Sequence, residues 1–231
     1  MEKDHLQTED GIILIDKPAG WTSFDVVAKI RGKIRATYRD RGEKPTKRQL
    51  KVGHAGTLDP FATGLLIILL GESTKKAGEF LKLDKIYEAE VILGQESTTG
   101  DPEGEITIVS DTRPTQEQVE EAIAQFRGEI TQRPPIFSAI KINGQRAYKL
   151  AREGKEVEIP ERQVTVYSLE LLEYSYPSLN VRVHVSSGTY IRSLAVDIGE
   201  TLGTGAYCKE LRRLSIADFS VVNAKTLTDI G

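Results

Sequence analysis

The chain of 231 residues is predicted to be an α+β protein in which helices flank a mixed, mostly antiparallel sheet. Two apolar segments, 11–17 and 65–70, have the composition of fully buried strands. Three others, 85–93, 164–172 and 179–186, alternate apolar with polar residues, which is typical of half-buried strands. Between them lie stretches with helical spacing of apolar residues and with N-capping residues, so both element types share one chain.

The composition is that of a globular protein, with 39% hydrophobic and 28% charged residues. This length suits one large domain or two small ones, and we expect a single domain over residues 1–231. No run of about 18 apolar residues occurs and the N-terminus is polar, so neither a membrane span nor a secretory signal is expected. The single cysteine, Cys208, excludes an intramolecular disulfide and a cysteine-based metal cluster. We therefore predict a cytoplasmic protein.

Charge is distributed unevenly along the chain, although the formal net charge is only −3. Residues 29–51 hold ten Lys or Arg and two acids, a local charge of +8, so the rest of the chain carries −11. Residues 88–129 hold eleven acids and two Arg, a local charge of −9. A basic segment on an acidic body is typical of a docking face for a polyanion. A solvated loop is the alternative interpretation.

The first third of the chain contains two predicted helices. The strand at 11–17 is followed by a helix at 24–35, with Ser23 as its N-cap. After the second apolar strand, Ser73 is expected to cap a short helix that ends near Leu81. The apolar positions of the first helix are Val26, Val27 and Ile30.

The middle of the chain combines strands, a helix and a hairpin. In the strand at 85–93, Tyr87 falls on the drier of the two faces. A short strand is expected at 105–109. Residues 115–118 have the pattern of a capping box, which predicts a helix that begins there. The dipeptide at 143–144, Asn-Gly, is a strong hairpin signal.

In the last third, the strands at 164–172 and 179–186 are predicted to be antiparallel partners. The following residues pass from strand into helix, so Tyr190 and Arg192 lie close to the helix start. The helix has an apolar stripe formed by Ile191, Leu194, Ala195, Ile198 and Leu202.

The segment 51–64 brings one imidazole, His54, close in sequence to one carboxylate, Asp59. Because Pro60 disfavours the α region for the residue before it, Asp59 is held extended on a loop that three glycines interrupt. Such a loop before a buried strand is a common way to aim a catalytic group. An Asx-turn, in which Asp59 bonds to its own loop, is the structural alternative.

Residues 53–66, Gly-His-Ala-Gly-Thr-Leu-Asp-Pro-x-Ala-Thr-Gly-Leu-Leu, resemble the motif around the catalytic aspartate of the tRNA pseudouridine synthase B family. The resemblance covers about residues 11–225, essentially the whole catalytic domain. It implies a pseudouridine-synthase-like fold and an isomerase that converts uridine 55 in the T loop of tRNA to pseudouridine without a guide RNA. Further stretches similar to family motifs are Asp16–Ser23, Gln132–Lys141, Tyr148–Gly154, Ser186–Leu194 and Glu210–Leu214.

The implied reaction moves the uracil linkage from N1 to C5, which involves neither redox chemistry nor hydrolysis, so no cofactor and no metal is expected. It requires a carboxylate, and the resemblance assigns that role to Asp59. Attack at C6 of the base, attack at C1′ of the ribose and proton abstraction from C2′ through a glycal all stay open. Asp59 must remain ionised in a water-poor pocket, so it needs a cation, and Arg192 is the candidate.

Other residues of these motifs are expected to hold the substrate. Tyr87 would stack on the flipped uracil, and Tyr190 would hold or relay a proton at C5. The alternative is that Tyr87 and Leu211 are core residues and Arg192 a surface cation. Contacts with substrate or RNA are implied for five residues: His54, Leu211, Lys17, Lys75 and Lys141.

One further segment departs from the family pattern, and another matches it. Residues 36–49, a basic insertion, depart from it, because this connection is usually shorter in the family. Residues 130–160, with a predicted short helix at 147–153, resemble a mobile thumb that closes over the T loop. Many family members continue with a PUA domain, and none is expected here.

We therefore predict a monomer that acts on the T arm of tRNA, with no membrane partner and no obligatory protein partner. Two alternatives are a guide-RNA-dependent synthase of the related archaeal and eukaryotic type, and a catalytically inert tRNA-folding module. The presence of Asp59, Tyr87, Tyr190 and Arg192 argues against the inert module.

Overall fold

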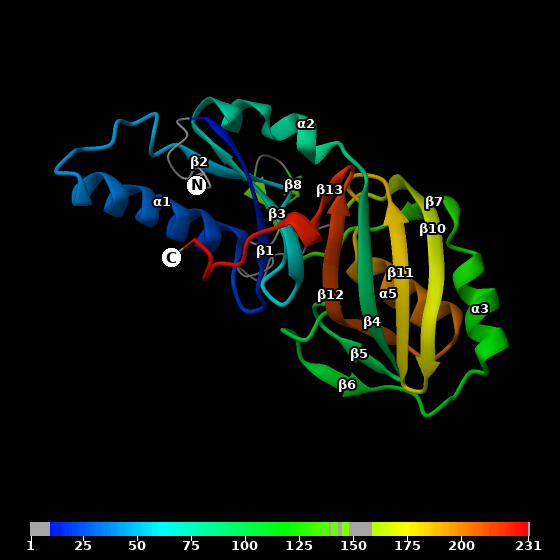
Figure 1. The fold of residues 1–231 in the computed structure, drawn as a ribbon. Helices are drawn as coiled ribbons and strands as arrows, with labels where there is room; N and C mark the ends of the chain where they lie inside the picture. Colours follow the sequence, from blue (N-terminus) through cyan, green and yellow to red (C-terminus); the bar gives the residue numbers. More distant parts are fainter. Residues whose placement is uncertain (1–9, 139, 143–144, 148–158, 231) are drawn as a thin grey trace. The chain divides into compact units, whose positions relative to one another are not determined.

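The computed structural model describes residues 10–138, 140–142, 145–147 and 159–230. The chain forms two compact units (Figure 1): unit 1 comprises Met1–Ile86 and Arg212–Gly231, and unit 2 comprises Tyr87–Leu211. The assignment of all 231 residues to one catalytic domain stays a prediction. Among the described residues, no helix is long and apolar enough to span a membrane.

In unit 1 the central strand is β3 (Thr63–Leu70). It pairs antiparallel with β1 (Gly11–Lys17) along the whole length of β1, and with β2 (Val52–Ala55). At its start it also pairs in parallel with the unit 1 part of β12 (Ala206–Ile216), which in turn pairs with β13 (Phe219–Ser220). One parallel contact among antiparallel ones makes this a mixed sheet, as predicted.

The apolar residues of β3 are buried on both faces, which confirms the prediction for 65–70. On one face the helix α1 (Ser23–Asp40) packs on the sheet. Its buried residues form a core with alternate residues of β1 and β3: Ile13, Ile15, Val26, Val27, Ile30, Ile34, Leu66 and Ile68. Fully apolar strands are typical of such two-sided burial.

On the other face, Leu65, Ile67 and Leu69 form a second core. Phe80 of α2 (Ala77–Leu81) packs there against Phe219, with ring centroids 5.8 Å apart. The helical region begins as a 3₁₀ helix, η2 (Gly71–Lys76), and ends at Leu81 as predicted. Ser73 was expected to cap it, but Ser73 lies within η2 and makes no capping hydrogen bond.

The start of α1 differs from the prediction. The N-cap is Thr22, whose hydroxyl accepts a hydrogen bond from the backbone N–H of Asp25 at 3.0 Å. The Asp25 carboxylate accepts one from the Thr22 N–H at 2.9 Å, which completes a capping box. Ser23, the predicted cap, is instead buried and hydrogen-bonded to Leu58, because two adjacent hydroxyls compete for one cap and only one can face the helix N-terminus.

The end of α1 lies at Asp40, five residues beyond the prediction. Ile34 is buried in the core and Tyr38 packs against it, so the apolar face continues through the basic residues. The helix stops before Gly42, whose φ of 70° is one that glycine adopts without strain.

Unit 2 contains strands in the spatial order β12-β4-β11-β10-β7. They are β4 (Lys85–Leu93), β11 (Ser178–Val185), β10 (Arg162–Ser175) and β7 (Gly128–Gln132). The pairings β10–β11 and β10–β7 are both antiparallel. The prediction that 164–172 and 179–186 are antiparallel partners is therefore confirmed, and so is the mostly antiparallel character of the sheet.

Two helices accompany this sheet, and Figure 1 shows α5 behind its strands. The helix α3 (Gln116–Ala124) begins with the predicted capping box of Thr115 and Gln118. The helix α5 (Ile191–Thr201) buries Leu194, Ala195 and Ile198, as its apolar stripe predicts. The smaller elements are β5 (Gln95–Ser97), β6 (Ile106–Ile108), β8 (Lys141–Ile142), β9 (Gln145–Arg146) and, in unit 1, the 3₁₀ helix η3 (Val221–Asn223).

The thumb-like segment 130–160 is described only in part. Strands β8 and β9 pair antiparallel and flank the predicted hairpin dipeptide Asn143-Gly144, which itself lies outside the described residues. Most of the predicted helix at 147–153, including Tyr148, also lies outside them.

Candidate active site

The loop between β2 and β3 carries Asp59, whose side chain is half-buried. Within the loop, one hydrogen bond joins the N–H of Ala62 to the carbonyl of Asp59 at 3.2 Å. Neighbouring segments also hold the loop. The carbonyl of Pro60 accepts hydrogen bonds from the N–H of Gly20 at 2.8 Å and from Nζ of Lys17 at 3.2 Å.

Lys17 is fully buried at the end of β1. Its ammonium also donates to the carbonyls of Trp21 at 2.7 Å and Pro18 at 2.8 Å. It therefore ties the turn after β1 to the loop of Asp59, because each buried carbonyl needs a donor. The predicted contact of Lys17 with RNA stays a prediction, and these hydrogen bonds give its ammonium a structural role.

The other side of the loop is held by Ser23 and Arg213. Ser23 Oγ accepts from the N–H of Leu58 at 2.9 Å and donates to the Leu58 carbonyl at 3.2 Å. The guanidinium of Arg213 is 1% exposed and donates to the carbonyls of Leu65 at 2.7 Å and Gly56 at 3.0 Å. Charged donors make the stronger hydrogen bonds, so Arg213 fixes both ends of the loop.

The conformation and surroundings of Gly64 require a glycine at the end of the loop. It has a φ of 101° and lies opposite Arg213 in the parallel pairing of β3 with β12. A Cβ at this position would lie 2.7 Å from the backbone nitrogen of Arg213 and closer still to its carbonyl oxygen. No side chain fits there without displacing β12.

The other predicted RNA-contact residues of unit 1 are on its surface or half-buried. His54 lies on β2 opposite Ile68 and is half-buried. Lys75 is exposed at the end of η2 and forms an ion pair with Glu72. Lys141 belongs to β8 of unit 2, and its side chain lies outside the described part of the chain.

In unit 2 the predicted cation, Arg192, lies in the first turn of α5 and is 3% exposed. Nη1 lies 2.9 Å from Oδ2 of Asp101 and donates to the carbonyl of Thr99 at 2.9 Å. Nη2 donates to the carbonyl of Phe137 at 2.8 Å. The side chain of Asp101 is equally buried, so this is a buried ion pair with additional acceptors around it. Arg192 is therefore a core group, and the alternative of a surface cation is wrong.

Tyr190 is the N-cap residue of α5 and is half-buried. The buried amide of Gln132 holds its backbone on both sides: Oε1 accepts from the Tyr190 N–H at 2.8 Å and Nε2 donates to the Tyr190 carbonyl at 3.0 Å. The guanidinium of Arg162 lies over the Tyr190 ring, 4.8 Å from its centroid. Tyr190 thus has both a fixed backbone and a supported ring.

Tyr87 and Leu211 lie on neighbouring strands, β4 and β12, and each is 8% exposed. Tyr87 is on the more buried face of β4, as the alternation predicts. The opposite, more exposed face carries Glu88, whose carboxylate accepts from Arg182 Nη2 at 2.6 Å.

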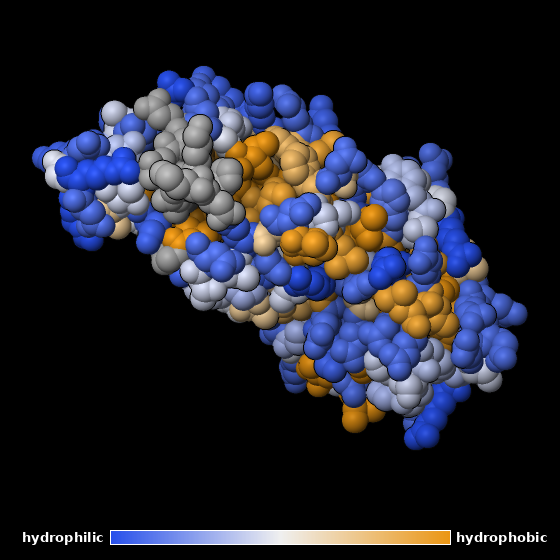
Figure 2. All heavy atoms as spheres, viewed as in Figure 1, coloured by the Kyte–Doolittle hydropathy of each residue, from blue (hydrophilic) through white to orange (hydrophobic). Residues whose placement is uncertain are grey.

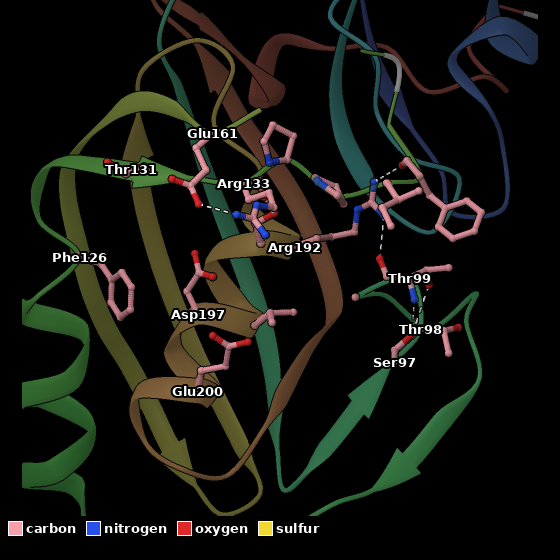
Figure 3. Close-up of a pocket in the computed structure, with 17 residues that line it drawn as sticks. Ser97, Thr98, Thr99, Phe126, Thr131, Arg133, Glu161, Arg192, Asp197 and Glu200 are labelled. Carbon is pink, nitrogen blue, oxygen red and sulfur yellow. Dashed lines mark hydrogen bonds and ion pairs between the residues drawn. The ribbon is translucent and has the colours of Figure 1, made fainter. Parts of the chain in front are cut away.

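A cavity of about 560 Å³ opens beside Arg192 in unit 2 (Figure 3). Residues of α5 and the segment 133–137 line it, with Arg133 and Glu161 forming an ion pair of 2.8 Å. Among the described residues, Arg192 is the one predicted site residue that lines this cavity. The cavity is therefore not by itself the predicted uracil pocket.

Half-buried Asp197 and buried Lys85 have shifted pKa values. Burial, reinforced by the negative charge of Glu200, raises the pKa of Asp197 from an ordinary value of 3.8 to about 6. Burial, reinforced by the positive charge of Arg213, lowers the pKa of Lys85 to about 8. Among the described residues there is no group of three side chains suited to hold a metal ion.

Three supporting residues were missed by sequence reasoning: Arg213, Gln132 and Asp101. Adjacent arginines on a strand point to opposite faces, so the pair 212–213 could have indicated one buried guanidinium. Gln132 is the first residue of a family-like motif, but its position in the sequence does not indicate that Tyr190 is its hydrogen-bond partner. Asp101 lies in a Gly-Asp-Pro sequence, which is typical of an exposed turn, so a buried ion pair was not expected there.

Comparisons with known proteins identify the family of the chain. Residues 44–191 match the model described as TruB family pseudouridylate synthase (N terminal domain), and residues 192–231 match that of the tRNA pseudouridylate synthase B C-terminal domain. The chain is 44% identical to tRNA pseudouridine synthase B of Cupriavidus pinatubonensis, over 95% of this chain and 67% of that protein. It is 45% identical to the protein of the same name from Aquifex aeolicus, over 95% of this chain and 73% of that protein.

A solved structure with a similar fold is the crystal structure of a Cbf5-Nop10-Gar1 complex, with a TM-score of 0.71 and 32% identity. The alignment covers 97% of this chain and 54% of that one, so the chain spans about half the length of this structural relative. The likeness confirms the pseudouridine-synthase-like fold.

Replacing Gly64 with Ala is expected to destabilise unit 1 by about 3 kcal/mol or more, because positive φ and overpacking against β12 add up. Gly42→Ala is the matched control for φ alone, since its φ is 70° and nothing lies within 4 Å of its Cβ position; about 1 kcal/mol is expected. Gly78→Ala, in open space, should be neutral or stabilising. Urea midpoints rank the three variants, and equal losses for Gly64→Ala and Gly42→Ala would contradict the close approach.

Replacing Asp197 with Asn is expected to stabilise the protein above pH 6 and to have no effect near pH 4. The raised pKa means that the folded state binds the proton more tightly than the unfolded state, so stability falls as pH rises from about 4 to 6. Asparagine does not ionise, so the stability of the Asp197→Asn variant does not fall in this way as pH rises. Melting temperatures of wild type and variant from pH 4 to 8 test it, with the exposed Asp111→Asn as control. A pH-independent difference would show that ionisation is not its cause.

Proposed function

The chain belongs to the TruB family of pseudouridylate synthases, and from this premise we propose that it is an isomerase that converts uridine to pseudouridine in tRNA. Its target is uridine 55 in the T loop, and it acts as a cytoplasmic monomer without a guide RNA. The observation that supports this proposal most is the loop of Asp59. Lys17, Ser23 and Arg213 hold it in place from three segments, as a positioned nucleophile requires.

The reaction breaks the C1′–N1 bond and forms a C1′–C5 bond after the base has turned within the site. Asp59 supplies the carboxylate that attacks the nucleotide or abstracts a proton from it. C5 then loses its hydrogen and N1 gains one, so that the product is an isomer of the substrate. Tyr190, whose backbone Gln132 fixes, holds or relays the proton at C5.

The extruded uridine needs a pocket that replaces its lost stacking, at a cost of a few kcal/mol. Tyr87 stacks on the uracil and Leu211 forms the opposite wall, and their low exposure suits such a dry site. His54, Lys75 and Lys141 contact the RNA.

Arg192 is the cation that this proposal assigns to keeping Asp59 ionised. Asp101 and the carbonyls of Thr99 and Phe137 support this role, because they hold the guanidinium in one orientation before substrate arrives.

A guide-RNA-dependent synthase is the second candidate. It is favoured by the structural likeness to a protein solved in a Cbf5-Nop10-Gar1 complex. The tRNA synthases are more similar in sequence, at 43–45% identity against 32% for that chain, and we therefore rank guide-independent action first.

The purified protein, incubated with an unmodified tRNA transcript and no other RNA or protein, tests this function. Mapping should find pseudouridine at the T-loop uridine, and a stem–loop of the T arm should suffice as substrate, since a folded loop is read by its shape. Product that forms only after another RNA or protein is added would favour the guided type. No product under either condition would favour an inert tRNA-folding module.

Asp59→Asn is expected to abolish pseudouridine formation while tRNA affinity stays within about twofold, because the amide cannot act as nucleophile or base. Single-turnover rates and filter-binding affinities give the two quantities. Asp218→Asn, an exposed aspartate of unit 1, is the control and should keep full activity. Turnover by Asp59→Asn above a protein-free reaction would remove Asp59 from the mechanism.

Arg192→Lys is expected to slow the single-turnover rate by about 10²-fold, since a point charge loses one or two charged hydrogen bonds. Lysine keeps a positive charge beside Asp101, so the fold should survive, which thermal melting checks. Arg182→Lys, at the half-exposed pair with Glu88, is the matched control and should leave the rate unchanged. Equal rates for both variants would refute the role of Arg192.

A further inference from the structure

The basic segment 29–51, called here the basic arm, is a folded element of unit 1. Its first part is the second half of α1, and the chain turns back after Gly42. A one-turn structure follows, in which the N–H of Thr46 donates to the Gln49 side chain at 2.7 Å and the N–H of Lys51 donates to the Arg48 carbonyl at 3.0 Å. The arm therefore presents its side chains from a fixed backbone.

Three cations of the basic arm hold the arm itself in place. Arg31 donates to the carbonyls of Leu50 and Val52, both at 3.1 Å, and so ties the returning chain to α1. Arg48 forms an ion pair with Asp10, and Lys51 lies 3.9 Å from a carboxylate oxygen of Glu72. Their charges are used to build the arm.

Other cations of the arm have no such partner. Arg39 lies 3.7 Å from Asp40, but this pair joins two neighbouring, exposed side chains and does not tie the arm to another segment. In the described residues, no acid lies within ion-pair distance of six others: Lys29, Lys33, Arg35, Arg41, Lys44 and Lys47.

Three cations form a row along α1, because Arg31, Arg35 and Arg39 are spaced by four residues. Arg31 is bonded to the returning chain, so the row lies on the side of α1 that faces this chain. Lys29 and Lys33 lie on another side of the helix. Figure 2 shows the surface over α1 and its following loop as mostly hydrophilic. Cations on one fixed side repel one another until an anion neutralises them.

We propose that the basic arm is a docking face for the phosphate backbone of the tRNA substrate, away from the base that reacts. This inference rests on the proposed function, which makes tRNA the partner. A polyanion fits because the arm carries +8 while the rest of the chain carries −11, so RNA is attracted here and repelled over the rest of the chain. Phosphate contacts position an RNA and do not read bases, so the arm adds affinity and leaves the choice of uridine unchanged.

The test is the salt dependence of tRNA affinity for the variant Arg35→Gln, Arg41→Gln, Lys44→Gln, Lys47→Gln. These four side chains are exposed or half-exposed and have no structural partner, so the fold is preserved. Each phosphate that the variant no longer neutralises lowers the slope of log affinity against log salt by about 0.7–0.9 in magnitude. If the four cations together neutralise two to four phosphates, the slope should fall by about 1.5–3.5, with an unchanged single-turnover rate at saturating tRNA.

Two matched pairs of substitutions distinguish an effect of the basic arm from an effect of the protein's net charge. Lys44→Gln with Lys47→Gln should weaken binding, whereas Lys82→Gln with Lys225→Gln, which removes the same charge from exposed sites elsewhere in unit 1, should not. Asp40→Asn with Glu43→Gln should tighten it. Equal slopes for wild type and the four-site variant, or equal effects of the two lysine pairs, would overturn the inference. Failure of the proposed function is distinguished by absent pseudouridine in the wild-type reaction, since the binding slopes are measured without turnover.

Discussion

Arg213 is the group on which the Asp59 loop depends most. The loop is interrupted by glycines and by proline, so its backbone is irregular. The guanidinium of Arg213 satisfies the carbonyls of Gly56 and Leu65 from inside unit 1. Each hydrogen bond from a charged donor contributes about 1.5–3 kcal/mol. Because Arg213 is 1% exposed, these bonds form away from bulk solvent, where they are electrostatically stronger.

Unit 2 uses a similar arrangement around Arg192. Carbonyls of two separate segments, Thr99 and Phe137, converge on one guanidinium, and Asp101 neutralises its charge. The neutral amide of Gln132 plays a similar part, because it forms hydrogen bonds with both the N–H and the carbonyl of Tyr190. In each unit, a long planar side chain with several donors organises irregular backbone that no helix or strand could satisfy. Asp59 lies on such backbone and Tyr190 at its border with α5, which explains why their supports are buried.

Local patterns predicted the regular elements well. The run 65–70 is buried on both faces, the capping box at Thr115 begins a helix, and the alternation of 85–93 places Tyr87 on the buried side. Errors arose where two local signals competed. At the start of α1, Thr22 and Ser23 are both good caps, and the hydrogen bond of Ser23 to Leu58, 35 residues away, decides between them.

The sequence by itself determined the family, the strands and most helices, and the identity of the candidate catalytic residues, because these depend on residue types at fixed spacing. Only the tertiary structure decided which polar groups are buried together. It paired Arg192 with Asp101, 91 residues apart, turned Lys17 into a support for the loop, and bonded Arg31 and Arg48 of the basic arm to other segments of unit 1. Such choices depend on which carbonyls and carboxylates remain unsatisfied once the elements pack, and no pattern along the chain records that.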